Sequence, residues 1–366
     1  MKVTRLSWTS FRLPLRAPFQ TASGEMTHRE GLVLRLSTDA GVVGLGEASS
    51  HPAAGPGAAW EVEEALAHLA PRLLGADAGC LEELAREAPP ALACAIDTAG
   101  LDVLARARGV GVARLLSERP RAGVQVNATI GAEGEVEAAL QATGAREAGF
   151  ACVKLKVGMA RSVEGERGRV AAVRRALGPE IRLRVDANGA WDSEQAIATI
   201  HALEEYDVEY VEQPVAPGAP GAMARVRAAV RVPIAADEDV VNLESARRVL
   251  EAGAADALVI KPMVVGGLRP ARQIAELASE AGVAVVITTT IDAGVGTAAA
   301  LHLAATLPAD GPACGLATGS LLSDDLVVRP LSARDGWMTV PAGAGLGVEL
   351  DEAKLAMYGG AEREVA

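Results

Sequence analysis

From about residue 124 onward, short runs rich in β-branched residues alternate with longer alanine-rich stretches that have helical periodicity. Such alternation is typical of parallel strands joined by helices. Eight strand-like runs are present, at 124–131, 152–158, 181–188, 208–214, 232–239, 257–262, 282–290 and 313–319. Because eight strand–helix units can close into a ring, the pattern favours a (β/α)8 TIM barrel; an open doubly wound sheet is the alternative.

The first 120 residues have a different pattern. Two strand-like runs, 2–15 and 31–38, flank the turn-rich stretch 18–30, and helical spacing follows at 59–73 and 91–116. Such an order predicts an α+β unit rather than further barrel repeats. We therefore predict an α/β protein in three parts: an α+β cap domain over 1–120, a modified (β/α)8 barrel over 121–325, and a C-terminal segment over 326–366 that returns to the cap.

Charge and hydropathy narrow the class of partner. The net charge of −12 argues against nucleic acid, whose binding needs clustered basic residues. No run approaches the roughly 18 apolar residues that cross a bilayer, and Lys2, Arg5 and Arg12 interrupt any apolar stretch of a signal peptide. We expect a cytoplasmic protein that acts on a small molecule and binds neither nucleic acid nor membrane. The sequence is compatible with a homo-oligomer.

Lysine is rare in this chain, with five lysines against thirty arginines. Arginine keeps its proton near neutral pH, whereas a desolvated lysine amine can release one. Lys154, Lys156 and Lys261, which lie in predicted strands, are therefore candidates for proton transfer. The alternative is that they are the chance remainder of an arginine-rich composition.

Ionisable residues recur at the ends of the predicted strands. Strands buried on both faces should be apolar, and barrel active sites lie at the carboxyl ends of the strands. The residues are Lys154 and Lys156 on the second strand, Asp186, Glu212 and Asp237 at the ends of the third to fifth, and Lys261 at the end of the sixth. In a closed ring of eight, the second and sixth strands face each other, so lysine amines should flank the acids.

Three carboxylates without histidine or cysteine form an oxygen-only site, which suits Mg²⁺, with Mn²⁺ as a substitute. Internal ion pairs with the lysines are the alternative, although three acids at one depth would repel one another without a cation. We choose Asp237 over Asp239 as the third ligand, and we expect Glu238 to support the ligands. Asn188, two residues after Asp186, either orients a substrate or closes a turn.

At these positions the chain resembles the enolase superfamily, and within it the muconate lactonizing subgroup. The resemblance covers nearly the whole chain. Its motifs are GLGEAS at 44–49, KLK at 154–156, VDAN at 185–188, VEQP at 211–214, ADE at 236–238 and KPMVVGG at 261–267.

The resemblance implies an enolase-like fold and removal of a proton from the carbon beside a substrate carboxylate, which gives an ene-diolate. Such a carbon is a very weak acid, and positive charge at the carboxylate offsets the second negative charge that develops. By resemblance, Asp186, Glu212 and Asp237 bind Mg²⁺, Lys156 is the base on one face, Lys261 lies on the opposite face, and Lys154 assists electrostatically.

Within the subgroup, PFQTASGEMTHREG at 18–31 and GLATGSLLSDDLV at 315–327 resemble o-succinylbenzoate synthases, the dehydratases (lyases) of menaquinone biosynthesis. Muconate cycloisomerases, N-acylamino acid racemases and dipeptide epimerases are the alternatives. The epimerases typically carry an acid–x–acid pair near the eighth strand, whereas Asp324 and Asp325 are adjacent here. A synthase would also have a serine-rich seventh strand end, where this chain has threonines; we expect Thr289 and Thr290 to donate to the substrate carboxylate.

The stretch from Pro18 to Arg29 is predicted to be a mobile lid over the barrel mouth. Phe19, Gln20 and Thr21 would then contact the part of the substrate remote from the metal. An ordinary hairpin connection on the outer surface is the alternative. Two further hypotheses are a metal-free Schiff-base aldolase with Lys261 as the amine, which leaves the three acids unexplained, and a non-catalytic barrel.

Overall fold

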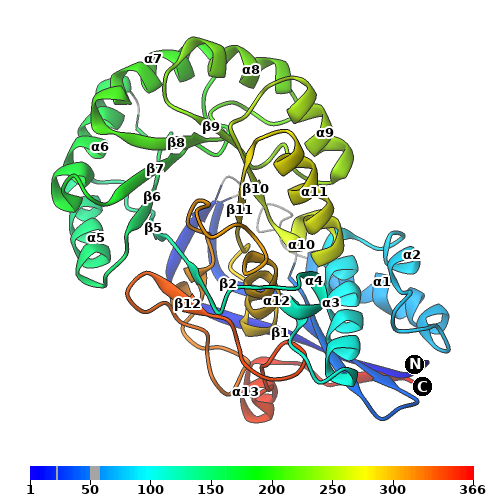
Figure 1. Cartoon of the computed structure of the whole chain (residues 1–366). Helices are drawn as coiled ribbons and strands as arrows, with labels where there is room; N and C mark the ends of the chain where they lie inside the picture. The colour runs from blue at the N-terminus through cyan, green and yellow to red at the C-terminus, as the bar shows by residue number, and fades with distance from the viewer. Residues whose placement is uncertain (22–23, 50–57, 161) are drawn as a thin grey trace.

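The computed structural model describes residues 1–21, 24–49, 58–160 and 162–366, without the side chains of 19–21, 24–25 and 58–59. Two bodies are visible: a ring of strands wrapped by helices, and a cap domain that contains both ends of the chain (Figure 1). No helix among the described residues is long and apolar enough to cross a membrane.

The cap is built on an antiparallel sheet of order β13-β1-β2-β3, with β1 (Val3–Thr21), β2 (Gly24–Thr38), β3 (Val43–Ala48) and β13 (Arg363–Val365). Because β13 pairs with β1, the C-terminal segment lies on the cap. Three helices pack beside this sheet around a separate apolar core: α1 (Ala58–Leu73), α2 (Glu82–Ala85) and α3 (Pro90–Ala107). The short helix α4 (Val112–Leu116) follows α3, and its buried side chains belong to the core of the barrel.

β1 and β2 form one long hairpin, which corrects the expected turn-rich loop at 18–30. Antiparallel pairing continues beyond a register shift after Pro14 to the pair Thr21↔Gly24. The stretch is rich in residues that tolerate turns, but the backbone partner across the hairpin stabilises extended structure. The hairpin reaches the barrel, since Leu15 bridges Leu322 and the amide of Ser323 donates to the Pro14 carbonyl at 2.9 Å.

The barrel sheet is parallel and has the order β11-β10-β9-β8-β7-β6-β5. Its strands are β5 (Ala128–Ile130), β6 (Cys152–Lys156), β7 (Arg182–Asp186), β8 (Val208–Glu212), β9 (Ile234–Ala236), β10 (Ala257–Ile260) and β11 (Ala284–Ile287). Helices cover the outside (Figure 1): α5 (Glu135–Glu147), α6 (Val163–Leu177), α7 (Ser193–Leu203), α8 (Pro220–Ala229), α9 (Leu243–Glu251) and α11 (Leu268–Glu280). On the cap side, α10 (Pro262–Val265) contacts α3, and α12 (Gly294–Ala304) contacts β3 and α4.

The predicted eighth strand is reduced to two residues, which corrects the expectation for 313–319. Cys314 bridges Val126 and Gly315 bridges Thr288, so backbone hydrogen bonds close the ring on both sides. The chain then enters a 3-10 turn at Ala317–Leu321. Glycine is required at this closure, because a Cβ on Gly315 would lie 2.4 Å from Thr288 Oγ1. Short pairing therefore replaces a full strand.

Two other expectations change in detail. The predicted first strand, 124–131, divides into β4 (Gly123–Gln125) and β5, and β4 pairs with β12 (Trp337–Thr339) outside the ring. The helical stretch 91–116 divides into α3 and α4, because the chain turns at Gly109, which has a φ of 64°. The last helix, α13 (Glu352–Tyr358), contacts β1 of the cap.

Candidate active site

Three of the predicted residues are direct neighbours in the parallel sheet. The register pairs Lys156 of β6 with Asp186 of β7, and Asp186 with Glu212 of β8. All three stand at the last position of their strands, so their side chains lie at one depth at the carboxyl end of the ring. Alternation along β6 puts Lys154 on the same face, while Val153 and Leu155 are buried in the apolar core.

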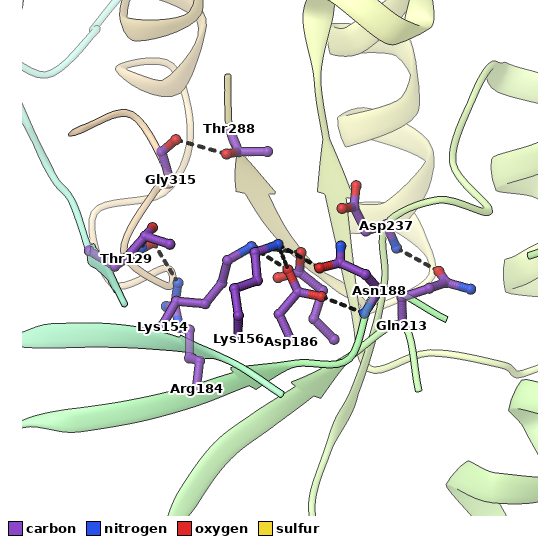
Figure 2. Close-up of polar contacts among 12 residues, drawn as sticks. Thr129, Lys154, Lys156, Arg184, Asp186, Asn188, Gln213, Asp237, Thr288 and Gly315 are labelled. Atoms are coloured by element: carbon purple, nitrogen blue, oxygen red, sulfur yellow. Dashed lines mark hydrogen bonds and ion pairs between the residues drawn. The ribbon is translucent and has the colours of Figure 1, made fainter. Parts of the chain in front are cut away.

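The amines of β6 hold this row together. Lys156 Nζ donates to Asp186 Oδ2 at 2.6 Å, and Lys154 Nζ lies 2.9 Å from the same oxygen. Lys154 also donates to Glu212 Oε1 at 2.8 Å. Figure 2 shows both lysines reaching toward Asp186. Two cations and two buried carboxylates therefore form one network.

Asp237 and Lys261 form the other side of the site. Lys261 follows β10 directly, and its amine donates to Asp237 Oδ2 at 2.5 Å. Asp237 follows β9, the strand next to β8. Since β7, β8 and β9 separate β6 from β10, the amines of Lys156 and Lys261 approach the acids from different sides.

The pKa values of the ionisable groups in this site are shifted because the groups are buried close to one another. Burial, together with the charges of Asp186 and Asp237, raises the pKa of Glu212 to about 8. Burial also acts to raise the pKa of Asp186, but Lys154 and Lys156 outweigh it and the net shift is downward. Burial acts to lower the pKa of Lys261, yet Asp237 and Glu238 raise it overall. The carboxylates thus interact as one cluster.

The chemistry of this donor set fits a divalent metal. Asp186, Glu212 and Asp237 offer only carboxylate oxygens, are at most 4% exposed, and repel one another enough to shift the pKa of Glu212. As they stand, no three histidine, cysteine or acidic side chains among the described residues converge closely enough to hold an ion. The lysine amines bond to the oxygens that an ion would take.

Asn188 and Glu238 form a hydrogen-bonded chain that begins at Lys156. Asn188 Oδ1 accepts from Lys156 Nζ at 2.7 Å (Figure 2). Asn188 Nδ2 donates to Glu238 Oε1 at 2.8 Å. Asn188 adopts a left-handed backbone with a φ of 45°, which asparagine tolerates better than most residues. Glu238 Oε2 is buried and has no hydrogen-bond partner among the described residues. Burial and Asp237 raise the pKa of Glu238 to about 7.

Gln213 is a supporting residue that sequence reasoning missed. Its Oε1 accepts from the amide of Asp237 at 3.1 Å (Figure 2). Its Nε2 donates to Asp239 Oδ2 at 2.9 Å. Asp239 also accepts from the Gly218 amide at 2.7 Å. The carboxylate of Asp239 therefore stabilises the loop, and Asp237 is the acid that meets Lys261. The position of Gln213 directly after Glu212 was the signal that was available.

The threonines after β11 lie differently from the expectation. Thr289 Oγ1 is 2.6 Å from Thr318 Oγ1. Thr290 Oγ1 donates to Asp292 Oδ1 at 2.6 Å and accepts from Arg29 of the cap at 3.0 Å. The hydroxyl of Thr290 is therefore engaged at the boundary between cap and barrel, away from the predicted role on the substrate carboxylate.

The predicted substrate contacts at the hairpin tip are the side chains of residues 19–21. The side chains of Phe19, Gln20 and Thr21 lie outside the described part of the chain, where only their backbone pairing with β2 is given. Arg29, by contrast, is buried and contacts the loop after β11. Sequence reasoning also gave no role to Glu47, although an acid within the buried strand Val43–Ala48 was a signal.

Comparison with known protein families matches both halves of the chain. Residues 4–117 match the mandelate racemase / muconate lactonizing enzyme N-terminal domain, and residues 137–354 match the enolase C-terminal domain-like family. These two ranges correspond to the cap and to the barrel with part of the C-terminal segment.

Curated relatives cover the chain to different extents. A chloromuconate cycloisomerase from Cupriavidus necator is 34% identical over 98% of this chain and 99% of its own length. An o-succinylbenzoate synthase from Thermobifida fusca is 42% identical over 64% of this chain and 70% of its own length. The first match covers more of the chain, and the second has the higher sequence identity over its shorter aligned range.

Among solved structures, a dipeptide epimerase from Cytophaga hutchinsonii complexed with Mg and the dipeptide D-Ala-L-Val is 25% identical, with a TM-score of 0.92 and full coverage of both chains. The agreement extends to the cap as well as the ring. This chain belongs to the enolase superfamily and is an enzyme of its muconate lactonizing subgroup.

Proposed function

We propose that this enzyme removes a proton from the carbon beside the carboxylate of a small substrate, and that its reaction is the dehydration of a succinyl-hydroxycyclohexadiene carboxylate to o-succinylbenzoate. The observation that carries the chemistry is the row Lys156, Asp186 and Glu212 at one strand-end level, with Lys261 paired to Asp237 on the other side. The 42% identity to the o-succinylbenzoate synthase of Thermobifida fusca supports the particular reaction.

Each residue has a separate part in this proposal. Lys156 takes the proton, and Asn188, which accepts a hydrogen bond from its amine, orients it. Lys261 offsets negative charge from the opposite side. A divalent metal, typically Mg²⁺, held by Asp186, Glu212 and Asp237 would supply positive charge at the substrate carboxylate. The superfamily fold and the Mg-complexed epimerase of similar structure support this metal.

The proposed elimination balances with a single base. The C–H bond beside the carboxylate breaks, its proton goes to Lys156, and its electrons form the new ring double bond as the adjacent C–O bond breaks. The hydroxide that leaves takes this proton back from Lys156 and departs as water, so the amine returns to its starting state and the ring becomes aromatic without an oxidant. Lys261 needs no proton exchange in this route, because both groups leave from one face.

Cycloisomerisation of a muconate is the second candidate, since the chloromuconate cycloisomerase of Cupriavidus necator is similar along almost the whole chain. Epimerisation of dipeptides has less support. Asp324 is engaged by Lys354 and Tyr358, and Asp325 accepts from the Gly294 amide at 2.7 Å. These acids are therefore held in structural contacts and do not form a pair for a substrate ammonium.

A substrate panel tests the proposal. The purified enzyme with Mg²⁺ is given the cyclohexadiene carboxylate, cis,cis-muconate, an N-acylamino acid and a dipeptide, and kcat/KM is measured for each. We expect the first substrate to exceed the others by at least about 100-fold, corresponding to about 3 kcal/mol of transition-state discrimination. A higher value with muconate would favour the second candidate and refute the dehydration.

A further inference from the structure

We propose that Arg29 and Glu47, two buried residues of the cap, are positioning residues for the barrel's chemistry. They hold the loop after β11 in the conformation that keeps the end of β11 beside Lys261. The effect on turnover rests on the proposed function, whereas the effect on the loop does not. The five residues involved form what we call the cap–barrel cluster: Arg29, Glu47, Ser49, Thr290 and Asp292.

The guanidinium of Arg29 joins its own strand β2 to the end of β3 and to the loop after β11. Its Nε donates to the carbonyl of Ile291 at 3.1 Å, and its Nη2 donates to Thr290 Oγ1 at 3.0 Å and to the carbonyl of Ser49 at 2.8 Å. The residue is 3% exposed. A planar group with several fixed donors can make these contacts together, which a lysine ammonium in its place could not reproduce.

Glu47 holds the start of α12 from the other domain. Its Oε1 accepts from the Ala293 amide at 2.8 Å, and its Oε2 accepts from the Gly296 amide at 2.7 Å. The first amides of a helix have no partner within the helix, so a carboxylate from β3 satisfies them here. Ser49 donates to the same carboxylate at 2.9 Å.

The loop that these residues hold is strained. Ile291 has a φ of 65°, a left-handed conformation that a β-branched residue rarely adopts. Such strain persists where the surroundings fix it, and it is frequent beside active sites. Arg29 binds the carbonyl of Ile291, and Asp292 Oδ1 accepts from the amide and the hydroxyl of Thr290 at 3.1 and 2.6 Å.

The loop also continues directly from the candidate active site. The Thr288 amide donates to the carbonyl of Ile260, the residue before Lys261, at 3.0 Å. Burial raises the pKa of Asp292, and the positive charges of Arg29 and Lys261 oppose this rise. A displacement of the loop would therefore move β11 against β10 and change the field at Lys261.

Charge within the cluster makes the guanidinium necessary. A Cβ on Gly296 would lie 3.2 Å from both Asp292 Oδ2 and Glu47 Cδ, so the two carboxylates approach each other around this glycine. Burial, followed by the charge of Asp292, raises the pKa of Glu47 to about 7. Removal of Arg29 would leave two buried acids without their cation, and this cost is relieved either by proton uptake or by movement of the loop.

Amide hydrogen exchange, measured residue by residue in the whole chain, tests whether Arg29 and Glu47 fix the loop after β11. The variants are Arg29→Lys and the milder Thr290→Val, which removes one hydroxyl between Arg29 and Asp292 and keeps the shape. We expect exchange of the Ala293 and Gly296 amides to accelerate at least about tenfold. The Gly294 amide, in the same helix start but bonded to Asp325 at 2.7 Å, is the internal control and should keep its rate.

Kinetics test the consequence for catalysis. We expect kcat to fall about tenfold in both variants, with KM within about twofold of the wild-type value. Arg12→Lys, on the exposed side of the same hairpin where Arg12 pairs with Glu30, is the matched control and should change neither readout.

Unchanged exchange rates of the Ala293 and Gly296 amides in both variants would refute the claim that the cap residues fix this loop. Faster exchange with an unchanged kcat would refute the positioning role and leave a structural one. If the wild type turns over no substrate of the panel, the proposed function fails. The exchange rates would still show whether Arg29 and Glu47 fix the loop after β11.

Discussion

The amine of Lys156 lies 2.6 Å from Oδ2 of Asp186, its direct neighbour in the parallel register of β6 and β7. A candidate base and a candidate metal ligand are thus fixed relative to each other by sheet pairing, which is more rigid than a loop. Because Glu212 continues the same row on β8, the site inherits its geometry from the ring. Substitutions in this row should therefore alter chemistry more than folding.

Lys261→Arg separates an electrostatic role from a second-base role. Arginine keeps the positive charge beside Asp237 but does not cycle a proton near neutral pH. If dehydration is the reaction, we expect at least about a tenth of the wild-type kcat to remain. The measurement is kcat with the cyclohexadiene carboxylate, and thermal unfolding checks that the variant is folded. Complete loss of turnover in a folded variant would argue for proton transfer by Lys261.

Metal binding should be measurable without turnover. Mg²⁺ held by the three acids binds only the folded state, so excess Mg²⁺ should raise Tm; at 100 times Kd the stabilisation is about 2.7 kcal/mol. Asp186→Asn should lose this rise, measured by thermal unfolding with and without Mg²⁺. Asp324→Asn, which removes an acid paired with Lys354, should keep it. A Tm that does not respond to Mg²⁺ in the wild type would contradict the metal site.

Gln213→Ala should lower both the stability of the protein and its response to Mg²⁺. The variant leaves the Asp237 amide and the Asp239 carboxylate without their buried partner, which costs about 1–3 kcal/mol of the free energy of unfolding. Because Asp237 is then less well fixed, the Mg²⁺-dependent rise in Tm should also shrink. Denaturant unfolding and Mg²⁺ titration check the two effects. Full stability with an undiminished Mg²⁺ response would show that Gln213 supports nothing essential.

Glu47→Gln should change the pH dependence of stability. The pKa of Glu47 is raised from 4.5 to about 7, so its contribution is present below pH 4.5 and is lost as the pH rises through 7. Glutamine does not titrate, and the destabilisation by this substitution should shrink by up to about 3 kcal/mol between pH 5 and pH 8. Arg29, Asp292 and Cys94 are the charged or titratable groups around it. A difference that is constant with pH, measured by denaturant unfolding, would contradict the shift.

Much of the site's arrangement could be predicted from the sequence, for a specific reason. Period-two alternation places Lys154 and Lys156 on one face, and the strand-end rule for barrels places Asp186 and Glu212 at their level. Both rules act within one strand or between adjacent strands. The ion pairs between these residues follow the same logic.

Features that depend on distant contacts could not be predicted in this way. The eighth strand shortens to a bridge because Gly315 must fit against Thr288, a contact between separate units. Thr290 resembles a substrate contact until Arg29 of the cap is seen to bind its hydroxyl. The sequence of 18–30 predicts a loop where the structure has a hairpin, because turn-forming residues do not reveal a partner strand.

The most direct test of proton abstraction by Lys156 is the release of deuterium from substrate labelled at the carbon beside the carboxylate. With Mg²⁺ present, we expect the wild type to release the label to water and Lys156→Ala to lose at least about 10⁴-fold of that rate. The control is Lys354→Ala, which removes a lysine that pairs with Asp324, and its rate of label release should equal that of the wild type. Thermal unfolding should show that all three proteins are folded. Wild-type rates of label release from folded Lys156→Ala would contradict the account.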